Sequence, residues 1–247
     1  MSLFEVKNIS FSYGEHLIFS DISFSIDKGD VLCILGPNGT GKTTLIKCLN
    51  GLNDINSGEI LINGKNIQKL SFKEISKHIG YIPQSHIPSF PFKVLDVVMM
   101  GRAPYLNLSS TPNDEDVEIA LNALKVLSID HLKDKEYTNL SGGERQLVFI
   151  ARALTQDSKI IVMDEPLSAL DFGNQQRLFR LLLELKRKGK TIIFTTHNPN
   201  HLTEINAAIY AMKNGTINKI EELTVDSLND IYDDEFTLKD GYFNFKI

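Results

Sequence analysis

The nine residues from Gly36 to Thr44 read GPNGTGKTT and directly follow the apolar run VLCIL, which ends at Leu35. A strand, a loop with the spacing G-x-x-x-x-G-K-[ST] and a helix, in that order, form a phosphate-binding loop. Glycines at 36, 39 and 41 permit backbone conformations that a Cβ would penalise, so successive amide hydrogens can point at one anion. The motif therefore predicts a nucleotide-binding α/β fold.

Side chains of the loop add to this main-chain cradle. Lys42 supplies a charge to the β- and γ-phosphates, Thr43 offers a hydroxyl to Mg²⁺, and the helix expected to run to about Asn50 adds partial positive charge at its start. A glycine-rich turn with a surface lysine is the alternative, and the order of strand, loop and helix disfavours it. We expect nucleotide contacts from Gly36, Pro37, Asn38, Gly39, Thr40, Gly41, Lys42, Thr43 and Thr44.

Composition limits the classes of protein that remain. A chain of 247 residues with 42% hydrophobic residues can bury the core of one domain with two lobes. Its net charge of -5 provides no basic surface for nucleic acid, which we do not expect as a partner. No apolar run is long enough to span a bilayer, and the first residues, MSLFEVKN, lack the features of a signal peptide. The sequence favours a cytosolic location.

Cysteines and histidines give no sign of a structural metal. Cys33 and Cys48 both lie among apolar neighbours, which favours core packing over redox or metal chemistry. The six histidines show no ligand-like spacing with cysteines or carboxylates. We predict that no structural metal is present.

Hydrophobic patterning predicts two kinds of sheet. Alternating segments, and one that leads into the turn Asn63-Gly64, indicate a small antiparallel sheet from Leu3–Ile9, Ile22–Ile26 and Glu59–Ile62. Continuous apolar runs are typical of parallel strands that are buried on both faces, and they occur at Val31–Leu35, Ile160–Met163 and Thr191–Thr195.

Helical periodicity appears in two longer segments. Asp114 to Leu127 carries apolar residues at helical spacing, namely Val117, Leu121, Leu124 and Leu127. Arg177 to Lys190 repeats the pattern with Leu178, Leu181, Leu182 and Leu185, and Gly189 marks its end. We expect both stripes to be core. The sequence after Gly215 is acidic and weakly periodic, and we interpret it as a peripheral C-terminal appendage with no chemistry.

The strand KIIVMDEP ends in the acidic pair Asp164-Glu165 at the carboxyl end of the predicted parallel sheet. One carboxylate can hold Mg²⁺ through its water shell while the next orients an attacking water. This pair lies beside the phosphate loop if the two strands are neighbours. Two acids that merely cap a strand are the alternative interpretation.

A second motif, LSGGERQL at Leu140 to Leu147, precedes that strand. Ser141 with Glu144 three residues later predicts a capping box at the start of a helix. A cap does not require two consecutive glycines, which weaken a helix. Gly142 and Gly143 make sense if an anion approaches the backbone at the helix N-terminus.

Taken together, these motifs resemble the nucleotide-binding subunits of ABC transporters, and the resemblance covers about Leu3 to Ile217. The motifs appear in the order of that family: an aromatic residue near the start, Walker A, a glutamine loop, the LSGGERQ signature, Walker B with its glutamate, the SALD loop and a switch histidine. In this chain they are Tyr13, Gly36–Thr44, Gln84, Leu140–Gln146, Ile160–Glu165, Ser168–Asp171 and His197.

The resemblance implies a fold and its divisions. We expect a P-loop NTPase of the RecA-like type, with a mixed sheet core, an N-terminal antiparallel β subdomain and an inserted α-helical subdomain at about 85–155. The nucleotide-binding domain would span 1–220, and 221–247 would be the appendage.

Roles of single residues follow from the same resemblance. Tyr13 would stack on adenine, Gln84 would touch Mg²⁺ and the attacking water, and Asp164 would organise the metal. Glu165 would act as general base and His197 would contact the γ-phosphate. Taken alone, Tyr13 reads as packing, Gln84 as a surface residue and His197 as a structural histidine, so the order of the motifs carries these assignments.

A dimer is also implied by the resemblance, because the signature of one subunit binds the γ-phosphate held by the other. Ser141, Gly142 and Gly143 would complete the partner's site, with Asp171 near the crossing. Since the chain has one of each motif, a homodimer with ATP and Mg²⁺ as cofactors is the simplest expectation.

The cargo is suggested by the segment from Ser85 to Tyr105, which would receive a helix of a membrane permease. Its string VLDVVMMGRAPY and the later LSGGERQLVFIARAL resemble ATPases of importers for iron-siderophore complexes, haem and cobalamin, and a molybdate or tungstate importer is similar. Iron-chelate uptake, with a substrate-binding protein as indirect partner and a place at the cytoplasmic face of the membrane, is the first choice. The alternatives are zinc or manganese import, export, or a cluster-assembly ATPase with soluble partners.

Overall fold

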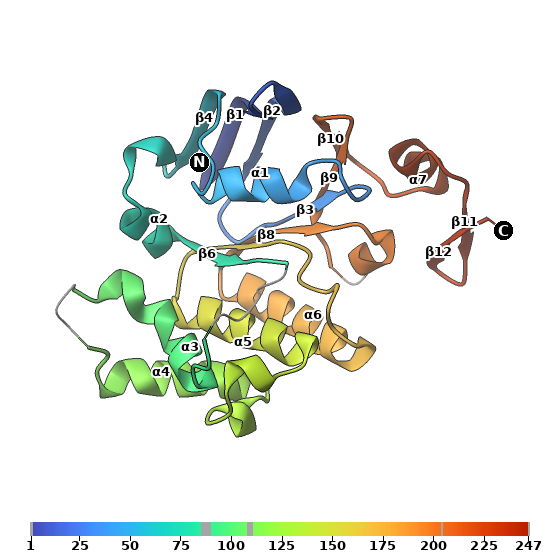
Figure 1. The fold of residues 1–247 in the computed structure, drawn as a ribbon. Coiled ribbons are helices and arrows are strands. Elements are labelled where there is room, and N and C mark those ends of the chain that lie inside the picture. The colour runs from blue at the N-terminus through green and yellow to red at the C-terminus, as the bar shows by residue number, and fades with distance from the viewer. Residues whose placement is uncertain (1, 85–89, 108–110, 204, 247) are drawn as a thin grey trace.

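A central six-stranded sheet divides the molecule into two hydrophobic cores (Figure 1). The computed structural model describes residues 2–84, 90–107, 111–203 and 205–246. Strand β3 (Val31–Leu35) contributes to both cores, because Leu32 and Ile34 face one while Val31, Cys33 and Leu35 face the other. Helix α1 (Lys42–Leu49) and the N-terminal sheet cover one face of the central sheet, and α5 (Gly142–Thr155) and α6 (Phe172–Arg187) cover the opposite face.

The predicted N-terminal antiparallel sheet is present, with strand order β2-β1-β4-β5. Its strands are β1 (Phe4–Tyr13), β2 (His16–Ile26), β4 (Ser57–Ile62) and β5 (Lys65–Asn66). Both residues of the predicted turn, Asn63 and Gly64, have positive φ of 50° and 75°. Such a two-residue turn matches the twist of the strands that it joins.

The central sheet has the order β10-β9-β3-β8-β7-β6. Besides β3 it contains β6 (Ile79–Ile82), β7 (Ile160–Met163), β8 (Thr191–Thr196), β9 (Ala208–Lys213) and β10 (Thr216–Ile220). The three apolar runs are buried strands, as predicted. All pairings are parallel except that of β10 with β9. Strand β8 lies between β3 and β7, so the strands that carry the phosphate loop and the acidic pair are not neighbours.

Helices make up the rest of the two lobes. The α-helices are α1 (Lys42–Leu49), α2 (Phe72–His78), α3 (Val94–Met99), α4 (Asp114–Val126), α5 (Gly142–Thr155), α6 (Phe172–Arg187) and α7 (Val225–Tyr232). Short 3₁₀ turns are η1 (Ile67–Lys69), η2 (Met100–Tyr105), η3 (Asp130–Leu132), η4 (Tyr137–Asn139) and η5 (Pro199–Leu202). Among the described helices, none combines the length and apolar character that a membrane crossing needs.

The two predicted helical stripes differ in how they pack. In α6 the four predicted leucines are all buried, and Gly189 has the positive φ of 77° expected after a helix end. In α4 the buried face is rotated toward Ala120 and Ala123, whereas Val117 and Leu121 are only partly buried. Leu124 and Leu127 of the predicted stripe are buried as well, so the core face keeps two of its four predicted residues.

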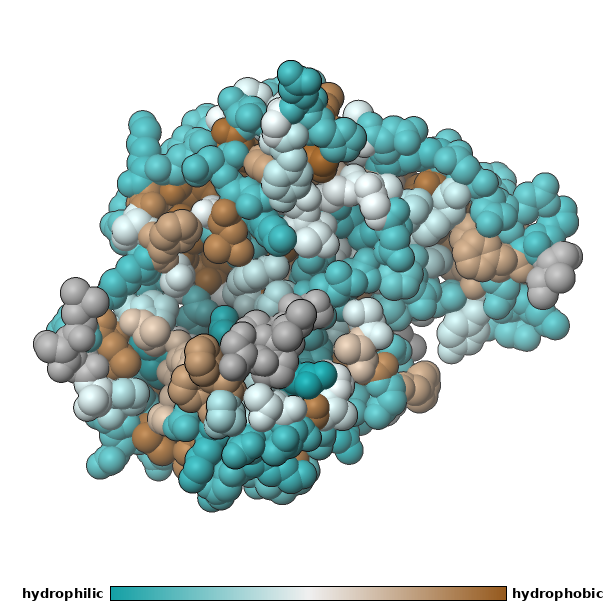
Figure 2. All heavy atoms as spheres, in the orientation of Figure 1, coloured by the Kyte–Doolittle hydropathy of each residue, from teal (hydrophilic) through white to brown (hydrophobic). Residues whose placement is uncertain are grey.

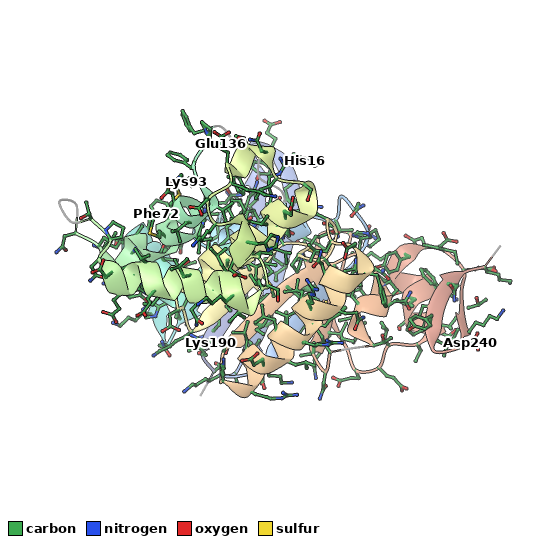
Figure 3. The ribbon with its side chains drawn as sticks, turned by 90° about the horizontal axis from the view of Figure 1, so that it is seen from below. His16, Phe72, Lys93, Glu136, Lys190 and Asp240 are labelled. Atoms are coloured by element: carbon green, nitrogen blue, oxygen red, sulfur yellow. The ribbon has the colours of Figure 1, made fainter. Side chains whose placement is uncertain are left out.

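The C-terminal segment is more integrated than the predicted appendage. Helix α7 is followed by a hairpin of β11 (Phe236–Lys239) and β12 (Tyr242–Phe245), and β10 belongs to the central sheet. Leu228 and Ile231 of α7 join the core below the sheet, as do Phe236 and Phe243. The expectation of a peripheral segment was wrong, because two apolar residues three positions apart are enough to bury one face of a short helix. The hairpin turn at Asp240 points away from the body (Figure 3).

Candidate functional site

The glycine-rich loop lies between the carboxyl end of β3 and the first turn of α1. Gly39 and Gly41 have φ of 83° and 99°, a region that strains any residue with a side chain, as predicted. Gly36 is glycine for another reason, because a Cβ there would overlap the carbonyl oxygen of Met212 on β9. The loop therefore depends on a close approach of two strands as well as on backbone freedom.

The ammonium of Lys42 is turned inward against its own loop. Its Nζ donates hydrogen bonds to the carbonyl oxygens of Gly36 and Pro37, each at 2.8 Å, and lies 3.5 Å from Oε1 of Glu165. Burial lowers the pKa of Lys42, while the charges of Glu165 and Asp164 act in the opposite direction. The lysine thus provides the positive charge of a site that is otherwise acidic.

A hollow of about 380 Å³ opens between this loop and the start of β2. Asn38, Gly39 and Thr40 line one side of it, and Leu17, which is 57% exposed, lies on β2 at the other side. Tyr13 does not line this hollow. Its ring is 52% exposed, with the edge-to-face neighbour Phe11 and a hydrogen bond accepted from Nδ2 of Asn53.

Asp164 is buried at the carboxyl end of β7, with one oxygen bonded and one without a partner. Its Oδ1 accepts a hydrogen bond of 2.8 Å from Oγ1 of Thr195, and its Oδ2 is buried without a hydrogen-bond partner among the described residues. An unpaired buried carboxylate oxygen is costly. The donor set therefore fits a hard cation such as Mg²⁺, which prefers oxygen ligands and retains several waters.

Glu165 has a strained backbone at the point where its carboxylate enters the site. Its φ of 44° lies in the left-handed region, which for a residue with a side chain costs roughly 1–2 kcal/mol. The amide of Glu165 donates to the same Thr195 hydroxyl that donates to Asp164. One threonine on the intervening strand β8 therefore fixes both acids.

The carboxylate of Glu165 is the point where the predicted catalytic residues meet. Its Oε2 lies 2.6 Å from Nδ1 of His197, and its side chain is only 6% exposed. Since a carboxylate can only accept, Nδ1 carries the hydrogen, and Nε2 of the imidazole is directed away from Glu165. The structure therefore brings Lys42 and His197, both expected at the nucleotide site, into contact with Glu165.

Gln84 follows β6, the strand next to β7. The amide of Asp164 donates to the carbonyl oxygen of Ile82, which places the exposed Gln84 at the same edge of the sheet. The chain directly beyond it, Ser85 to Ser89, lies outside the described residues, so only the later part of the predicted permease-contacting segment can be located.

The residues after His197 form a tightly bonded turn, which we call the switch loop (197–202). Oδ1 of Asn198 accepts from the amide of Asn200, so its Nδ2 faces Nε2 of His201. Nε2 of His201 therefore accepts, and its Nδ1–H donates to Oγ1 of Thr196 at 2.8 Å. Burial and the neighbouring His197 lower the pKa of His201 to about 4. The neutral His201 ring therefore serves as an internal support of the switch loop.

Within one chain, the signature residues Ser141 to Gly143 lie apart from the cluster at Glu165. Ser141 caps α5 in the predicted capping box, accepting from the Glu144 amide while Glu144 accepts from the Ser141 amide. Ser141 and Gly142 are exposed, and a Cβ on Gly142 would meet nothing within 4 Å, whereas Gly143 faces the carbonyl oxygen of Ala169. In the described residues, no hydrogen bond or ion pair joins them to the cluster at Glu165.

Asp171 caps helix α6, where its Oδ1 accepts from the Asn174 amide at 2.8 Å. Both cysteines are buried, and burial raises the pKa of Cys48 to about 12, as expected for packing residues. No group of three or more metal-ligating side chains occurs within the described part of the chain.

Sequence reasoning missed two residues of the site. Thr195 was included only in an apolar run, although a threonine at the last buried position of such a strand is a hydroxyl that must find a partner. Tyr232 was assigned to the appendage, yet its hydroxyl donates to the carbonyl oxygen of His197 at 2.6 Å. No local signal in the sequence links residues 35 positions apart.

Comparisons with known proteins point to one family. The family model described as ABC transporter matches residues 19–168. The molybdate import ATP-binding protein MolC of Haemophilus influenzae is 40% identical over 202 residues, covering 81% of this chain and 75% of that protein. A probable iron chelatin transport ATP-binding protein of Helicobacter pylori is 41% identical over 211 residues, covering 85% and 83%. An inward-facing structure of the metal-chelate type of ABC transporter superposes with a TM-score of 0.83 at 33% identity, covering 98% and 94%.

Proposed function

This chain belongs to the ABC transporter family and is an ATPase of that family, and on this premise we propose that it energises an importer for an iron-chelate-type substrate through a membrane permease. Iron-siderophore complexes, haem and cobalamin form this substrate class. Its support is the similarity to an iron chelatin transport protein and to a metal-chelate type transporter. Molybdate or tungstate import is the second candidate, supported by MolC, and zinc or manganese import and cluster assembly remain alternatives.

The single observation that carries the ATPase part of the proposal is the contact of Glu165 with both Lys42 and His197. In the proposed reaction a water attacks the γ-phosphorus of ATP, the bond to ADP breaks, and Glu165 accepts the proton of the water. His197 holds the carboxylate through Nδ1 and reaches the γ-phosphate with Nε2. Lys42 exchanges its loop carbonyls for the β- and γ-phosphates.

Mg²⁺ fits the acidic end of β7. We propose that Asp164, through its unpaired Oδ2, and the hydroxyl of Thr43 hold the ion, with Gln84 nearby for a further contact. The ion would neutralise charge on the phosphates. Tyr13 would stack on adenine with its exposed ring, while the loop residues Gly36 to Thr44 would surround the phosphates.

The separation of the signature from the cluster supports a homodimer as the working unit. Ser141 and Gly142 are exposed at the N-terminus of α5, a helix of 14 residues, and Gly142 leaves its backbone open to an incoming anion. We propose that Ser141, Gly142 and Gly143 complete the partner's site, with Asp171 near the crossing. ATP would then close the dimer because it contacts both subunits.

A permease surface is proposed on the side of the molecule that carries α2. A groove of about 640 Å³ runs between α2 and η2, lined by Phe72, Lys73, Ala103 and Leu106. Phe72 is 68% exposed, and Figure 2 shows hydrophobic atoms gathered around α2. Figure 3 shows Phe72 on the opposite side of the molecule from Asp240. An amphipathic helix of the permease would fit this groove and hold the chain at the cytoplasmic face of the membrane.

The test is affinity purification from detergent-solubilised membranes of the native cell. We expect a polytopic membrane subunit to copurify with the wild-type chain and with Leu238→Asp, a control at another exposed apolar position, but not with Phe72→Asp. The associated substrate-binding protein would then be screened with ferric siderophores, haem, cobalamin, molybdate and manganese. Soluble companions alone would contradict import, and binding of molybdate alone would favour the second candidate.

A further inference from the structure

The C-terminal segment is bonded to the switch loop at two separate points. The Tyr232 hydroxyl, at the last residue of α7, donates to the main-chain oxygen of His197 at 2.6 Å. Further along, the side-chain amide of Asn200 forms two hydrogen bonds with the backbone of Phe243. It accepts from the Phe243 N–H at 2.8 Å and donates to the Phe243 carbonyl oxygen at 2.9 Å. The Asn200 side chain therefore forms with β12 the same pair of hydrogen bonds that the backbone of a neighbouring strand would form.

These contacts are anchored in a buried base. Leu228 and Ile231 of α7 are 0% and 2% exposed, and both belong to the core beneath the central sheet. The ring of Tyr232 lies 5.4 Å from that of Phe236. Burial raises the pKa of the Tyr232 phenol well above its ordinary value, which keeps the hydroxyl a neutral donor. Because α7 is packed in the core, the Tyr232 hydroxyl is held in place, and it holds in turn the part of the switch loop whose carbonyl oxygen accepts from it.

His197 is therefore held from two sides. Its imidazole contacts the Glu165 carboxylate, and its carbonyl oxygen is bound by Tyr232. In addition, the neutral His201 ring lies between Thr196 and Asn198 and bonds to both side chains. The loop itself has only the short turn η5 of four residues for internal support. Without the C-terminal contacts, the main chain at residues 197 and 200 would have fewer restraints.

We propose that Tyr232 and Asn200 are positioning residues for catalysis, through which the C-terminal segment sets the geometry of His197 and hence the rate of ATP hydrolysis. The inference rests on the proposed role of the Glu165–His197 pair. It assigns a function to a segment whose sequence offers no motif. Because the bonds reach the main chain at His197 and the side chain of Asn200, and not the phosphate loop, they act on turnover and not on nucleotide affinity.

Two variants remove the contacts with little loss of packing. Tyr232→Phe deletes one hydroxyl and keeps the ring against Phe236, while Asn200→Ala removes both bonds to Phe243. Each should lower kcat for ATP by about 3- to 10-fold, the effect of one or two lost neutral hydrogen bonds, with an unchanged KM. The matched control is Tyr242→Phe, at a tyrosine on the same hairpin whose hydroxyl has no hydrogen-bond partner within the described residues, and it should retain full turnover.

A second readout follows the loop directly. Amide hydrogen exchange on the full-length chain should quicken in peptides covering 197–202 in Tyr232→Phe and Asn200→Ala, and stay at the wild-type rate in peptides covering 36–44. A change in KM with constant kcat, or faster exchange throughout the chain, would indicate general destabilisation and overturn the inference.

Glu165→Gln, assayed in parallel, separates this inference from the function on which it rests. Inactive Glu165→Gln beside a fully active Tyr232→Phe contradicts the positioning role alone. Full turnover in Glu165→Gln contradicts the proposed function and the positioning role with it. A reduced kcat in Tyr232→Phe, an inactive Glu165→Gln and localised exchange together support both.

Discussion

Oε2 of Glu165 lies 2.6 Å from Nδ1 of His197 across the ends of two neighbouring parallel strands. The glutamate side chain is 6% exposed and the histidine side chain is 43% exposed, so the pair spans the boundary between core and solvent. Burial keeps water from competing for the contacts of Glu165, and in the proposed function the exposed His197 would reach a bound nucleotide. This arrangement suits a base whose orientation must be fixed before the substrate arrives.

Replacing Glu165 by glutamine tests the proposed base. The amide keeps the size of the side chain but cannot accept the proton of the attacking water, so hydrolysis should fall by roughly 10²-fold or more. ATP affinity should persist and an ATP-bound dimer should accumulate, measured by phosphate release and by size-exclusion chromatography with light scattering. Unchanged turnover would remove Glu165 from the mechanism.

Lys42→Ala tests the phosphate loop. The substitution removes the positive charge that sits among Gly36, Pro37 and Glu165, and it leaves the glycine backbone in place. We expect the loss of tight ATP binding in isothermal titration calorimetry, because the phosphates lose their only side-chain cation in the loop. Normal affinity would contradict the assignment of Gly36 to Thr44.

Thr195→Val tests the bridge between the two acids. The variant removes the hydroxyl that serves the Asp164 carboxylate and the Glu165 amide, and leaving these buried groups unpaired should cost about 1–3 kcal/mol of stability. We also expect a lower kcat. Thr191→Val is the matched control, since this equally buried threonine on β8 bonds only to the loop at Asp27 and Gly29. It should lower the melting temperature similarly while kcat stays normal. Equal losses of kcat in both variants would show that Thr195 acts through stability alone.

Mixing experiments test the shared site. Ser141→Arg places a bulky cation where the partner's phosphate would dock, so its homodimer should lose hydrolysis. In mixtures with Glu165→Gln chains, one of the two sites of each heterodimer carries both defects and the other carries neither, so part of the activity should return. Normal hydrolysis by Ser141→Arg alone is incompatible with the trans-acting signature.

The pKa of His201 predicts a pH dependence of stability. Since it falls from 6.5 to about 4 on folding, the unfolded chain binds a proton in this range that the folded chain does not, and stability decreases as pH drops through that window. The loss should be about 1–2 kcal/mol, less than the full shift implies because the ring is partly exposed. Urea unfolding at pH 7.5 and pH 5 measures it, and His201→Gln should show a smaller difference than the wild type. An equal difference would exclude His201 as the source.

The sequence was sufficient for the parts of the fold that rest on local pattern. The phosphate loop, the buried strands β3, β7 and β8 and the capping box of α5 each have a motif or a hydrophobic period of their own. Strand β6 escaped notice because its four residues include a glycine and a half-buried tyrosine. Strand β9 has only two buried residues among its six and lacks the continuous apolar run.

The parts that could not be predicted depend on tertiary contacts. Strand β8 separates β3 from β7 in the sheet, and this order depends on topology. Because of it, Thr195 on β8 can bond to both Asp164 and Glu165. The close approach of Met212 that demands glycine at position 36 comes from a strand 176 positions later. Tyr232 likewise finds His197 only because α7 is anchored in the core. None of these leaves a periodic trace in the sequence.

The inward-turned Lys42 has a consequence for the nucleotide cycle. Its bonds to Gly36 and Pro37, together with its ion pair with Glu165, give the ammonium three partners within the protein, so in the proposed function ATP would compete with the protein's own carbonyls for it. This internal competition weakens binding of small anions, which cannot also engage the loop amides and Mg²⁺. After hydrolysis the same two carbonyls would again be available to the lysine as the product leaves. The loop is thereby set up to release its ligand as well as to hold it.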